Sequence, residues 1–222
     1  MMQIQVALDR LPLDRAIAIA SSIAPWVDGI EVGTSLVKEH GMSAVREVAD
    51  AVAATTNGPW VHADLKTVDD AVTEVTAALA AGATSVSVLA LASDTTIRAA
   101  IRTADERSAE VVLDLMLTDN SRRSELARWL PPHIRLGAHV GKDDQAGGTS
   151  VLDMLGDWAT GRRLAVAGGL GLDHVPALRT IPDLRLVVGS AVTGASDPSG
   201  VARALDEARR LPAAVHPGPD VR

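Results

Sequence analysis

The chain alternates short apolar runs with longer segments in which apolar side chains recur at helical spacing. The runs are rich in valine, isoleucine, leucine and alanine and recur at intervals of roughly 25 residues, which is typical of repeated strand–helix units. They predict strands over residues 4–9, 29–33, 60–66, 85–91, 111–116, 134–140, 164–169 and 184–190. Helices are predicted between the strands, among others over residues 68–80 and 198–210. This pattern predicts an α/β protein with parallel strands.

Eight such units predict a single (β/α)8 TIM barrel over residues 1–211, and a length of 222 residues suits one such domain. A doubly wound open sheet is the alternative architecture. It is disfavoured because no GxGxxG sequence follows the first strand and because eight units exceed what such sheets usually contain. The last segment, residues 212–222, carries three prolines and no periodicity, so we expect a disordered C-terminal tail there.

Composition and charge narrow the function. No apolar run approaches the roughly 18 residues that a membrane span needs, and no leader of basic then apolar residues opens the sequence. We therefore expect a soluble, cytoplasmic protein that contacts no membrane. The absence of cysteine excludes disulfides, thiolate nucleophiles and cysteine-bound zinc. A net charge of -7, scattered basic residues and the absence of Phe and Tyr argue against nucleic-acid binding.

Charged side chains stand at the ends of three predicted strands, where TIM barrels place their active sites. Asp64 and Lys66 are two residues apart in the third strand, so both face the barrel interior near its mouth. Asp9 closes the first strand, and Glu31 lies near the end of the second. A helix cap and a structural ion pair could explain single members of this group. Burying all four groups together is costly unless they are paired, metal-bound or functional.

Two histidines and one acid near these strands receive different interpretations. His139 ends the sixth strand and opens a polar, glycine-containing loop, which distinguishes it among the six histidines. His62 lies one layer below the charged pair, where a hydrogen-bonded core histidine is the favoured interpretation. Thr67 and Asp70 have the spacing of a capping box, so Asp69 is interpreted from its sequence context as a structural residue of a first helical turn.

Glycines end the last two strands, which is where barrels often bind phosphate through backbone amides. Gly168 and Gly169 follow the seventh strand, and Gly189 and Ser190 follow the eighth. Either motif alone could be an ordinary turn. Because both stand at the appropriate strand ends, and because glycine lets the backbone approach an anion closely, we expect a phosphate site there.

Six motifs stand in a fixed order along nearly the whole chain. They are ALDR at 7–10, IEVGTSL at 30–36, ADLKTVDD at 63–70, HVGKDDQAGG at 139–148, VAGGL at 166–170 and VVGSAV at 187–192. In this order they resemble the orotidine 5'-monophosphate decarboxylase superfamily, and within it the 3-hexulose-6-phosphate synthases and the 3-keto-L-gulonate-6-phosphate decarboxylases.

The resemblance implies roles for the charged residues already singled out. These roles are Mg²⁺ binding by Glu31 and Asp64, a place beside the reacting oxygens for Lys66 and Asp9, and proton transfer by His139. The resemblance also changes the interpretation of Asp69, which in this family reaches into the active site of the partner subunit. A homodimer with shared active sites and a phosphorylated ketose substrate are therefore implied.

The implied reaction is a Mg²⁺-dependent aldol addition of ribulose 5-phosphate to formaldehyde through an enediolate, or its reverse. Residues 139–145 match the H-x-G-x-D-x-Q of the synthases, but Lys142 stands where the decarboxylases carry a basic residue. Ser190 stands where the decarboxylases typically place an arginine on the phosphate, which favours the synthase. Decarboxylation of 3-keto-L-gulonate 6-phosphate therefore stays open as the alternative.

Three further functions are alternatives. A ribulose-phosphate 3-epimerase is disfavoured because metal-binding histidines cannot be placed at the strand ends. Lys66 could form a Schiff base with a carbonyl substrate, as lysines on barrel strands can. A binding role without turnover is the third. The Schiff-base mechanism needs a nucleophilic Lys66 and no metal, whereas the lyase that the resemblance implies needs Mg²⁺. A binding role needs no turnover at all.

Overall fold

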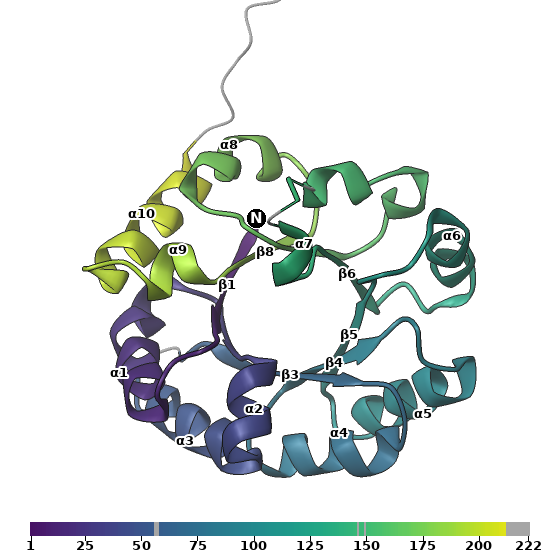
Figure 1. Cartoon of the computed structure of the whole chain (residues 1–222), viewed down its shortest axis with the longest axis horizontal. Helices are drawn as coiled ribbons and strands as arrows, with labels where there is room; N and C mark the ends of the chain where they lie inside the picture. Colours follow the sequence, from purple (N-terminus) through teal and green to yellow (C-terminus); the bar gives the residue numbers. More distant parts are fainter. Residues whose placement is uncertain (56–57, 146, 149, 212–222) are drawn as a thin grey trace, which may run out of the picture.

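The computed structural model describes residues 1–55, 58–145, 147–148 and 150–211. Eight parallel strands close into a barrel in sequential order, with β1 paired to both β2 and β8 (Figure 1). The strands are β1 (Gln3–Leu8), β2 (Gly29–Val32), β3 (Trp60–Thr67), β4 (Ser85–Leu89), β5 (Glu110–Asp114), β6 (Arg135–His139), β7 (Leu164–Ala167) and β8 (Leu184–Val188). The prediction of a single TIM barrel is confirmed, while the predicted tail, residues 212–222, lies outside the described residues.

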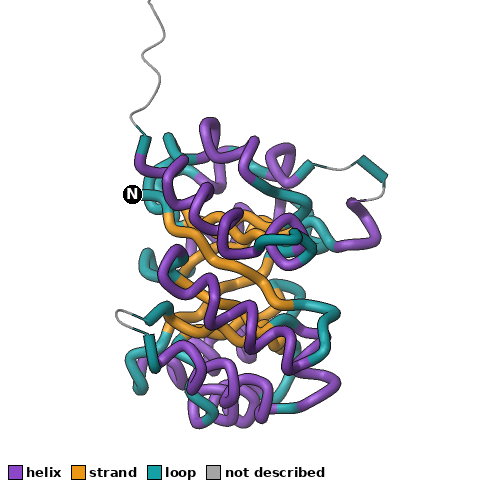
Figure 2. The backbone as a smooth tube through the Cα atoms, turned by 90° about the vertical axis from the view of Figure 1, so that its left-hand side faces the viewer, coloured by secondary structure: helices purple, strands orange, loops and turns teal. Residues whose placement is uncertain are grey.

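Helices surround the barrel (Figures 1 and 2). The α-helices are α1 (Leu13–Ile23), α2 (Thr34–His40), α3 (Met42–Ala53), α4 (Ala71–Ala80), α5 (Asp94–Asp105), α6 (Asn120–Trp129), α7 (Lys142–Gln145), α8 (Val175–Leu178), α9 (Ser190–Thr193) and α10 (Pro198–Arg210). Short 3-10 helices lie at Ala24–Trp26, Val151–Met154, Asp157–Ala159 and Leu172–His174. In the described part of the chain, no helix is both long enough and apolar enough to cross a membrane.

Alternate side chains of the strands point to two different places, the apolar core beneath the helices and the space inside the barrel. In β1, Ile4, Val6 and Leu8 are fully buried in the large apolar core that also contains residues of the surrounding helices. Gln5 and Ala7 alternate with them and line the space inside the barrel. The strand therefore holds the helices on one face and leaves the other face for the cavity.

Ion pairs close the amino-terminal end of the barrel. Glu110 at the start of β5 lies 2.7 Å from Arg185 of β8 and 3.1 Å from Arg135 of β6. The side chain of Arg135 is fully buried and also donates to the backbone carbonyl oxygens of Leu164 and Asp183. Because each buried charge has partners, this network can fill the barrel floor without an unpaired ion.

The predicted capping box at the start of α4 is wrong. The helix begins at Ala71, and its N-cap is Asp70, whose left-handed backbone (φ 48°) is unsuited to side-chain capping and makes no cap hydrogen bond. Thr67 ends β3 as a buried residue instead of capping the helix. Three residues, 68–70, therefore separate strand from helix and place Asp69 on an exposed turn.

Candidate active site

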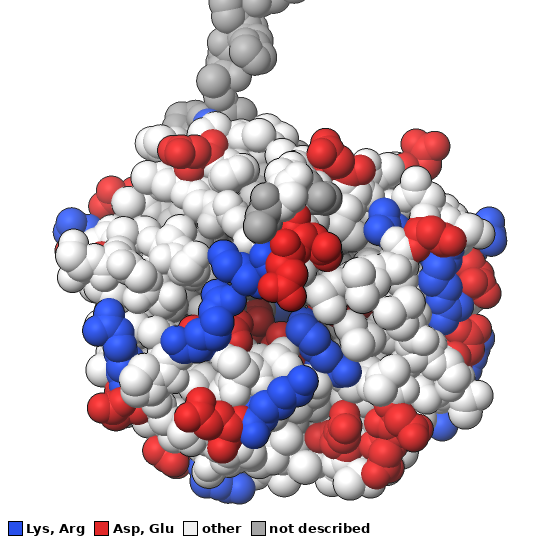
Figure 3. Space-filling view, viewed as in Figure 1, with Lys and Arg blue, Asp and Glu red and all other residues white. Residues whose placement is uncertain are grey.

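A cavity of about 860 Å³ opens at the carboxyl ends of the strands. In the space-filling view it is a hollow at the centre of the barrel face, with basic side chains around it and acidic ones both at its upper edge and within (Figure 3). Nine of the ten residues singled out from the sequence line it: Asp9, Glu31, Asp64, Lys66, His139, Gly168, Gly169, Gly189 and Ser190. The exception is Asp69, which is exposed and does not line the cavity of its own chain.

Lys66 lies between two carboxylates. Its Nζ is 3.0 Å from Asp64 Oδ2 and 3.1 Å from Asp114 Oδ2. Burial alone would lower the pKa of Lys66, but the charges of Asp64 and Asp114 outweigh burial and raise its pKa above the ordinary value. Lys66 is therefore a fixed positive charge. A Schiff-base lysine needs a lowered pKa to be nucleophilic, so this environment argues against that mechanism.

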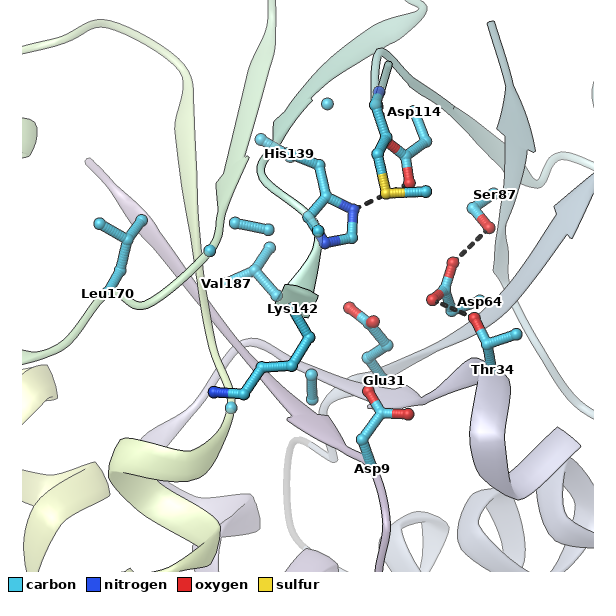
Figure 4. A pocket seen from close by; sticks show the side chains of 18 of the residues that line it. Asp9, Glu31, Thr34, Asp64, Ser87, Asp114, His139, Lys142, Leu170 and Val187 are labelled. Carbon is cyan, nitrogen blue, oxygen red and sulfur yellow. Dashed lines mark hydrogen bonds and ion pairs between the residues drawn. The ribbon is translucent and has the colours of Figure 1, made fainter. Parts of the chain in front are cut away.

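Hydroxyl groups fix Asp64 from two sides. Ser87 Oγ donates to Asp64 Oδ1 at 2.7 Å, and Thr34 Oγ1 donates to Oδ2 at 2.6 Å (Figure 4). Burial would raise the pKa of Asp64, but Lys66 and the two hydroxyl hydrogen bonds outweigh it and lower the pKa. Asp64 is consequently an ionised carboxylate of fixed orientation.

Asp114 orients His139. His139 Nδ1 lies 2.9 Å from Asp114 Oδ2, and the backbone N–H of Met116 donates to Oδ1 at 2.9 Å. Burial would raise the pKa of Asp114, but the hydrogen bond and charge of His139 and the charge of Lys66 lower it to about 2. An ionised carboxylate only accepts hydrogen bonds, so Nδ1 of His139 must be the donor. In neutral His139 the Nε2 atom is then free to accept a proton.

Glu31 has the opposite electrostatic environment. Its Oε2 accepts a hydrogen bond of 2.5 Å from Gln5 Nε2. Burial raises the pKa of Glu31, and the nearby carboxylates of Asp64 and Asp9 raise it further, to about 8. In Figure 4 the carboxylates of Asp9, Glu31 and Asp64 point into one region of the cavity. A cation placed among them would relieve this repulsion.

Asp9 is held against the start of α2. Its Oδ1 accepts hydrogen bonds from the Ser35 Oγ at 2.9 Å and from the Ser35 backbone N–H at 3.3 Å. Gly33 makes this position possible, because a Cβ atom there would lie only 2.2 Å from the Asp9 carboxylate. The G-T of the E-x-G-T motif therefore has two separate uses: Gly33 leaves room for Asp9, and Thr34 binds Asp64.

The turns after β7 and β8 contribute glycines to the wall of the cavity. Gly168 and Gly169 have φ angles of 126° and 67°, which L side chains rarely adopt. Gly189 precedes the short helix α9, which begins at Ser190. All four residues line the cavity, and three of them are glycines, whose backbone can approach an anion closely.

The donor set fits Mg²⁺. Within the described residues, no group of three His, Cys, Asp or Glu side chains is placed to hold a metal ion by itself. Mg²⁺ commonly uses only one or two protein carboxylates and completes its shell with water and substrate oxygens. Glu31 and Asp64 provide two carboxylates, and a divalent cation would offset both the burial and the repulsion by Asp64 and Asp9 that raise the pKa of Glu31.

The sequence-based interpretation of His62 is confirmed, whereas three site residues were missed. His62 is a buried residue of the cavity wall with Nδ1 2.8 Å from Ser85 Oγ, and burial lowers its pKa to about 4. The missed residues are Asp114, Ser87 and Thr34. Asp114 ends β5 as His139 ends β6, so the rule that charged strand ends mark the site would have found it.

Fold and cavity together define a TIM-barrel protein with an enzyme-like site at the carboxyl ends of its strands. Residues 2–205 match the family described as "Orotidine 5'-phosphate decarboxylase / HUMPS family", and the chain belongs to this family. The resemblance found in the motifs is thereby confirmed.

Named relatives cover almost the whole chain. The 3-hexulose-6-phosphate synthase of Mycobacterium gastri is 34% identical over 209 residues, which are 92% of this chain and 98% of the relative. A crystal structure of 3-hexulose-6-phosphate synthase from Salmonella typhimurium has a TM-score of 0.85 and 32% identity, covering 94% of this chain and 98% of that one. A 3-keto-L-gulonate-6-phosphate decarboxylase structure from Vibrio cholerae has a TM-score of 0.79 and 29% identity, with 94% and 97% covered. These names agree with the predicted class of enzyme, a carbon–carbon lyase.

Proposed function

We propose that the protein is a 3-hexulose-6-phosphate synthase, a lyase that joins formaldehyde to ribulose 5-phosphate or catalyses the reverse cleavage. The observation that carries this proposal is the chain of contacts from Asp64 through Lys66 and Asp114 to His139, with Glu31 beside it. It places a fixed positive charge next to an oriented proton acceptor. The names of the relatives support the same reaction.

The aldol addition begins with loss of a proton from carbon 1 of ribulose 5-phosphate, next to the ketone. His139 Nε2 is the acceptor, because Asp114 holds the proton of neutral His139 on Nδ1. The electron pair left behind gives an enediolate, whose negative charge the ammonium group of Lys66 stabilises. Carbon 1 then forms a bond to the formaldehyde carbon, and the formaldehyde oxygen takes up a proton. When bound by Glu31 and Asp64, Mg²⁺ would supply Lewis-acid stabilisation of developing oxygen charge.

The decarboxylase is the second candidate, and Lys142 is the observation that favours it. Lys142 begins α7, three residues after His139, and lines the same cavity. Loss of CO₂ from 3-keto-L-gulonate 6-phosphate also gives an enediolate, which a basic side chain in protonated form could help to protonate. The relatives of higher identity given above are synthases, which favours the first candidate.

Parallel assays separate the candidates. Purified protein with Mg²⁺ is given ribulose 5-phosphate plus formaldehyde in one assay and 3-keto-L-gulonate 6-phosphate in the other. We expect hexulose phosphate formation to exceed CO₂ release. His139→Gln should abolish it, while His133→Gln, a change of an exposed histidine that does not line the cavity, should not. Faster CO₂ release than aldol addition would make the protein a decarboxylase.

We further propose that the protein acts as a homodimer in which Asp69 completes the partner's site. Asp69 lies outside its own cavity on the turn between β3 and α4. Apolar side chains are exposed on this turn, at the start of α4 and on the turns after β4 and β5: Val68 (55%), Val72 (54%), Leu91 (53%) and Leu117 (70%). Exposed apolar side chains beside a functional acid are what a self-associating surface provides.

A further inference from the structure

Arg10 follows β1 in a backbone conformation that L side chains rarely adopt. Its φ angle is 53°, in the left-handed region, which costs a residue other than glycine of order 1 kcal/mol or more. The Ser35 hydroxyl holds this conformation by accepting the Arg10 backbone N–H at 2.8 Å. The same hydroxyl donates to Asp9 Oδ1 at 2.9 Å. One serine thus fixes an acidic side chain and the backbone of the neighbouring cation.

The same arrangement recurs at Lys66. Lys66 has a φ angle of 50°, and its backbone N–H donates to Ser87 Oγ at 2.9 Å. Ser87 Oγ in turn donates to Asp64 Oδ1 at 2.7 Å. Each of the two sites therefore combines a carboxylate, a serine hydroxyl and a cationic residue whose backbone has left-handed φ. Because Lys66 is central to the proposed chemistry, the matching construction at Arg10 indicates that its position is also functional.

The four cations that line the cavity differ in what they pair with. Lys66 is bound by two aspartates, and Arg185 lies 2.7 Å from Glu110 at the barrel floor. Among the described residues, the guanidinium of Arg10 and the ammonium of Lys142 have no hydrogen bond or ion pair. Arg10 and Lys142 are therefore available to an anionic ligand.

The barrel order places Arg10 next to the glycine turns. β1 pairs with β8, and the position of a Cβ atom on Gly189 would be 3.9 Å from the Ala7 carbonyl oxygen. The segments that follow β1 and β8 are thus neighbours at the cavity mouth, and α9 contacts β1. In the order β6, β7, β8, β1, Lys142 follows the first strand, the glycine turns follow the middle two, and Arg10 follows the last.

We propose that Arg10 binds the phosphate group of the substrate, supplying from β1 the positive charge that Ser190 does not supply from β8. This inference rests on the proposed function, because it assumes that the glycine turns hold a phosphate. Backbone amides bind phosphate without neutralising it, and a guanidinium adds bidentate hydrogen bonds and charge. Asp9 is held by Ser35, so the adjacent acid does not occupy the guanidinium.

The test compares Arg10→Asn and Arg10→Gly with Arg10→Lys and with a control, Arg15→Asn. Asn and Gly suit a left-handed backbone, so both remove the charge without adding strain. Arg15 lies in α1 on the same connection, is exposed and does not line the cavity. The measurements are kcat and KM for ribulose 5-phosphate at saturating formaldehyde, and the dissociation constant of inorganic phosphate by calorimetry.

We expect both neutral variants to raise KM and the phosphate dissociation constant by about 10- to 100-fold, with a much smaller change in kcat. Arg10→Lys should recover part of the affinity, and Arg15→Asn should match the wild type. Unchanged phosphate affinity in both neutral variants would overturn the proposal, as would a fall in kcat at constant KM. If the wild type makes no hexulose phosphate, the proposed function fails, but the phosphate measurement still decides the role of Arg10.

Discussion

Asp114 Oδ2 lies 2.9 Å from His139 Nδ1 and 3.1 Å from Lys66 Nζ, so one carboxylate oxygen joins the proposed base to the fixed cation. This contact selects the tautomer of His139, and the negative charge of the same carboxylate partly offsets the positive charge of Lys66. A residue that touches both groups should influence the rate without being needed for substrate binding. Asp114 is thus a positioning residue whose loss can be separated from loss of the fold.

We predict that Asp114→Asn lowers kcat by about 10²- to 10⁴-fold with little change in KM, because the amide no longer requires His139 to donate from Nδ1. Steady-state kinetics on ribulose 5-phosphate and formaldehyde measure this effect. Asp50→Asn, which changes an exposed aspartate of α3, is the matched control. A kcat near that of the wild type would show that Asp114 does not control the proton transfer.

Acid stability should also report on Asp114. Its pKa in the folded protein is about 2, below the ordinary value near 3.8. Because the folded-state pKa is depressed, the ionised group stabilises the protein above the unfolded-state pKa, and this contribution disappears as the pH falls from about 4 to about 2. It amounts to roughly 2 kcal/mol. Urea unfolding between pH 5 and pH 2 should therefore show a smaller pH-dependent loss of stability in Asp114→Asn than in the wild type.

Mg²⁺ binding is expected to strengthen as the pH rises through the range near 8. Burial, Asp64 and Asp9 raise the pKa of Glu31 to about 8 in the metal-free protein, so Glu31 is mostly protonated at pH 7 and must release its proton to bind the cation. Calorimetry in buffers of different ionisation enthalpy would detect this proton release. Glu31→Gln and Asp64→Asn should each abolish Mg²⁺-dependent turnover. Full activity of either variant in EDTA-containing buffer would exclude the metal assignment.

Sequence patterns located the barrel and most of its cavity for definite physical reasons. Parallel strands that are buried on both faces require continuous apolar runs. A charged residue or a glycine that interrupts such a run therefore indicates the end of the strand. The predicted helix over residues 198–210 agrees with α10, because Asp197 accepts a hydrogen bond from the Gly200 N–H and Pro198 opens the helix. Asp9, Glu31, Asp64 and His139 were found because each interrupts or ends an apolar run.

Left-handed backbone conformations and hydrogen bonds between neighbouring strands could not be predicted from the sequence. The left-handed backbones of Arg10, Lys66 and Asp70 depend on hydrogen bonds to distant hydroxyls or on turn geometry, and no local pattern of side chains marks them. The capping box at Thr67 was wrong for this reason. Ser87 could not be distinguished from other strand serines, because its partner Asp64 is on the neighbouring strand and the register is unknown before folding.

The glycine turns give a prediction on substrate binding. Gly189 has φ -103° and ψ -105°, which lies outside the regions that L side chains favour, although a Cβ atom there would meet nothing closer than the Ala7 carbonyl oxygen at 3.9 Å. Gly189→Ala should therefore lower stability without a steric clash, yet raise KM for the phosphorylated ketose more than it lowers kcat, because the phosphate is remote from the reacting carbons. Equal wild-type activity on ribulose 5-phosphate and on ribulose itself would contradict a phosphate site at this turn.

The last prediction concerns Asp69 and the proposed dimer. If Asp69 serves the partner's site, Asp69→Ala should lower kcat strongly, although it is exposed and does not line the cavity of its own chain. Loss of an exposed turn residue alone should change stability by only a few tenths of a kcal/mol. Asp70→Asn on the same turn is the control for a local structural effect, because asparagine tolerates the left-handed backbone of that position.

A mixing experiment separates the two roles of Asp69. Protomers carrying Asp69→Ala are combined with protomers carrying His139→Ala, each inactive alone, and subunit exchange is followed by native mass spectrometry. In a shared-site heterodimer, one of the two sites receives both an intact His139 and an intact Asp69, because the substitutions fall together in the other site. About half of the wild-type activity per heterodimer should then return. Exchange without any recovery of turnover would mean that Asp69 does not cross the interface, and the exposed apolar side chains beside it would need another explanation.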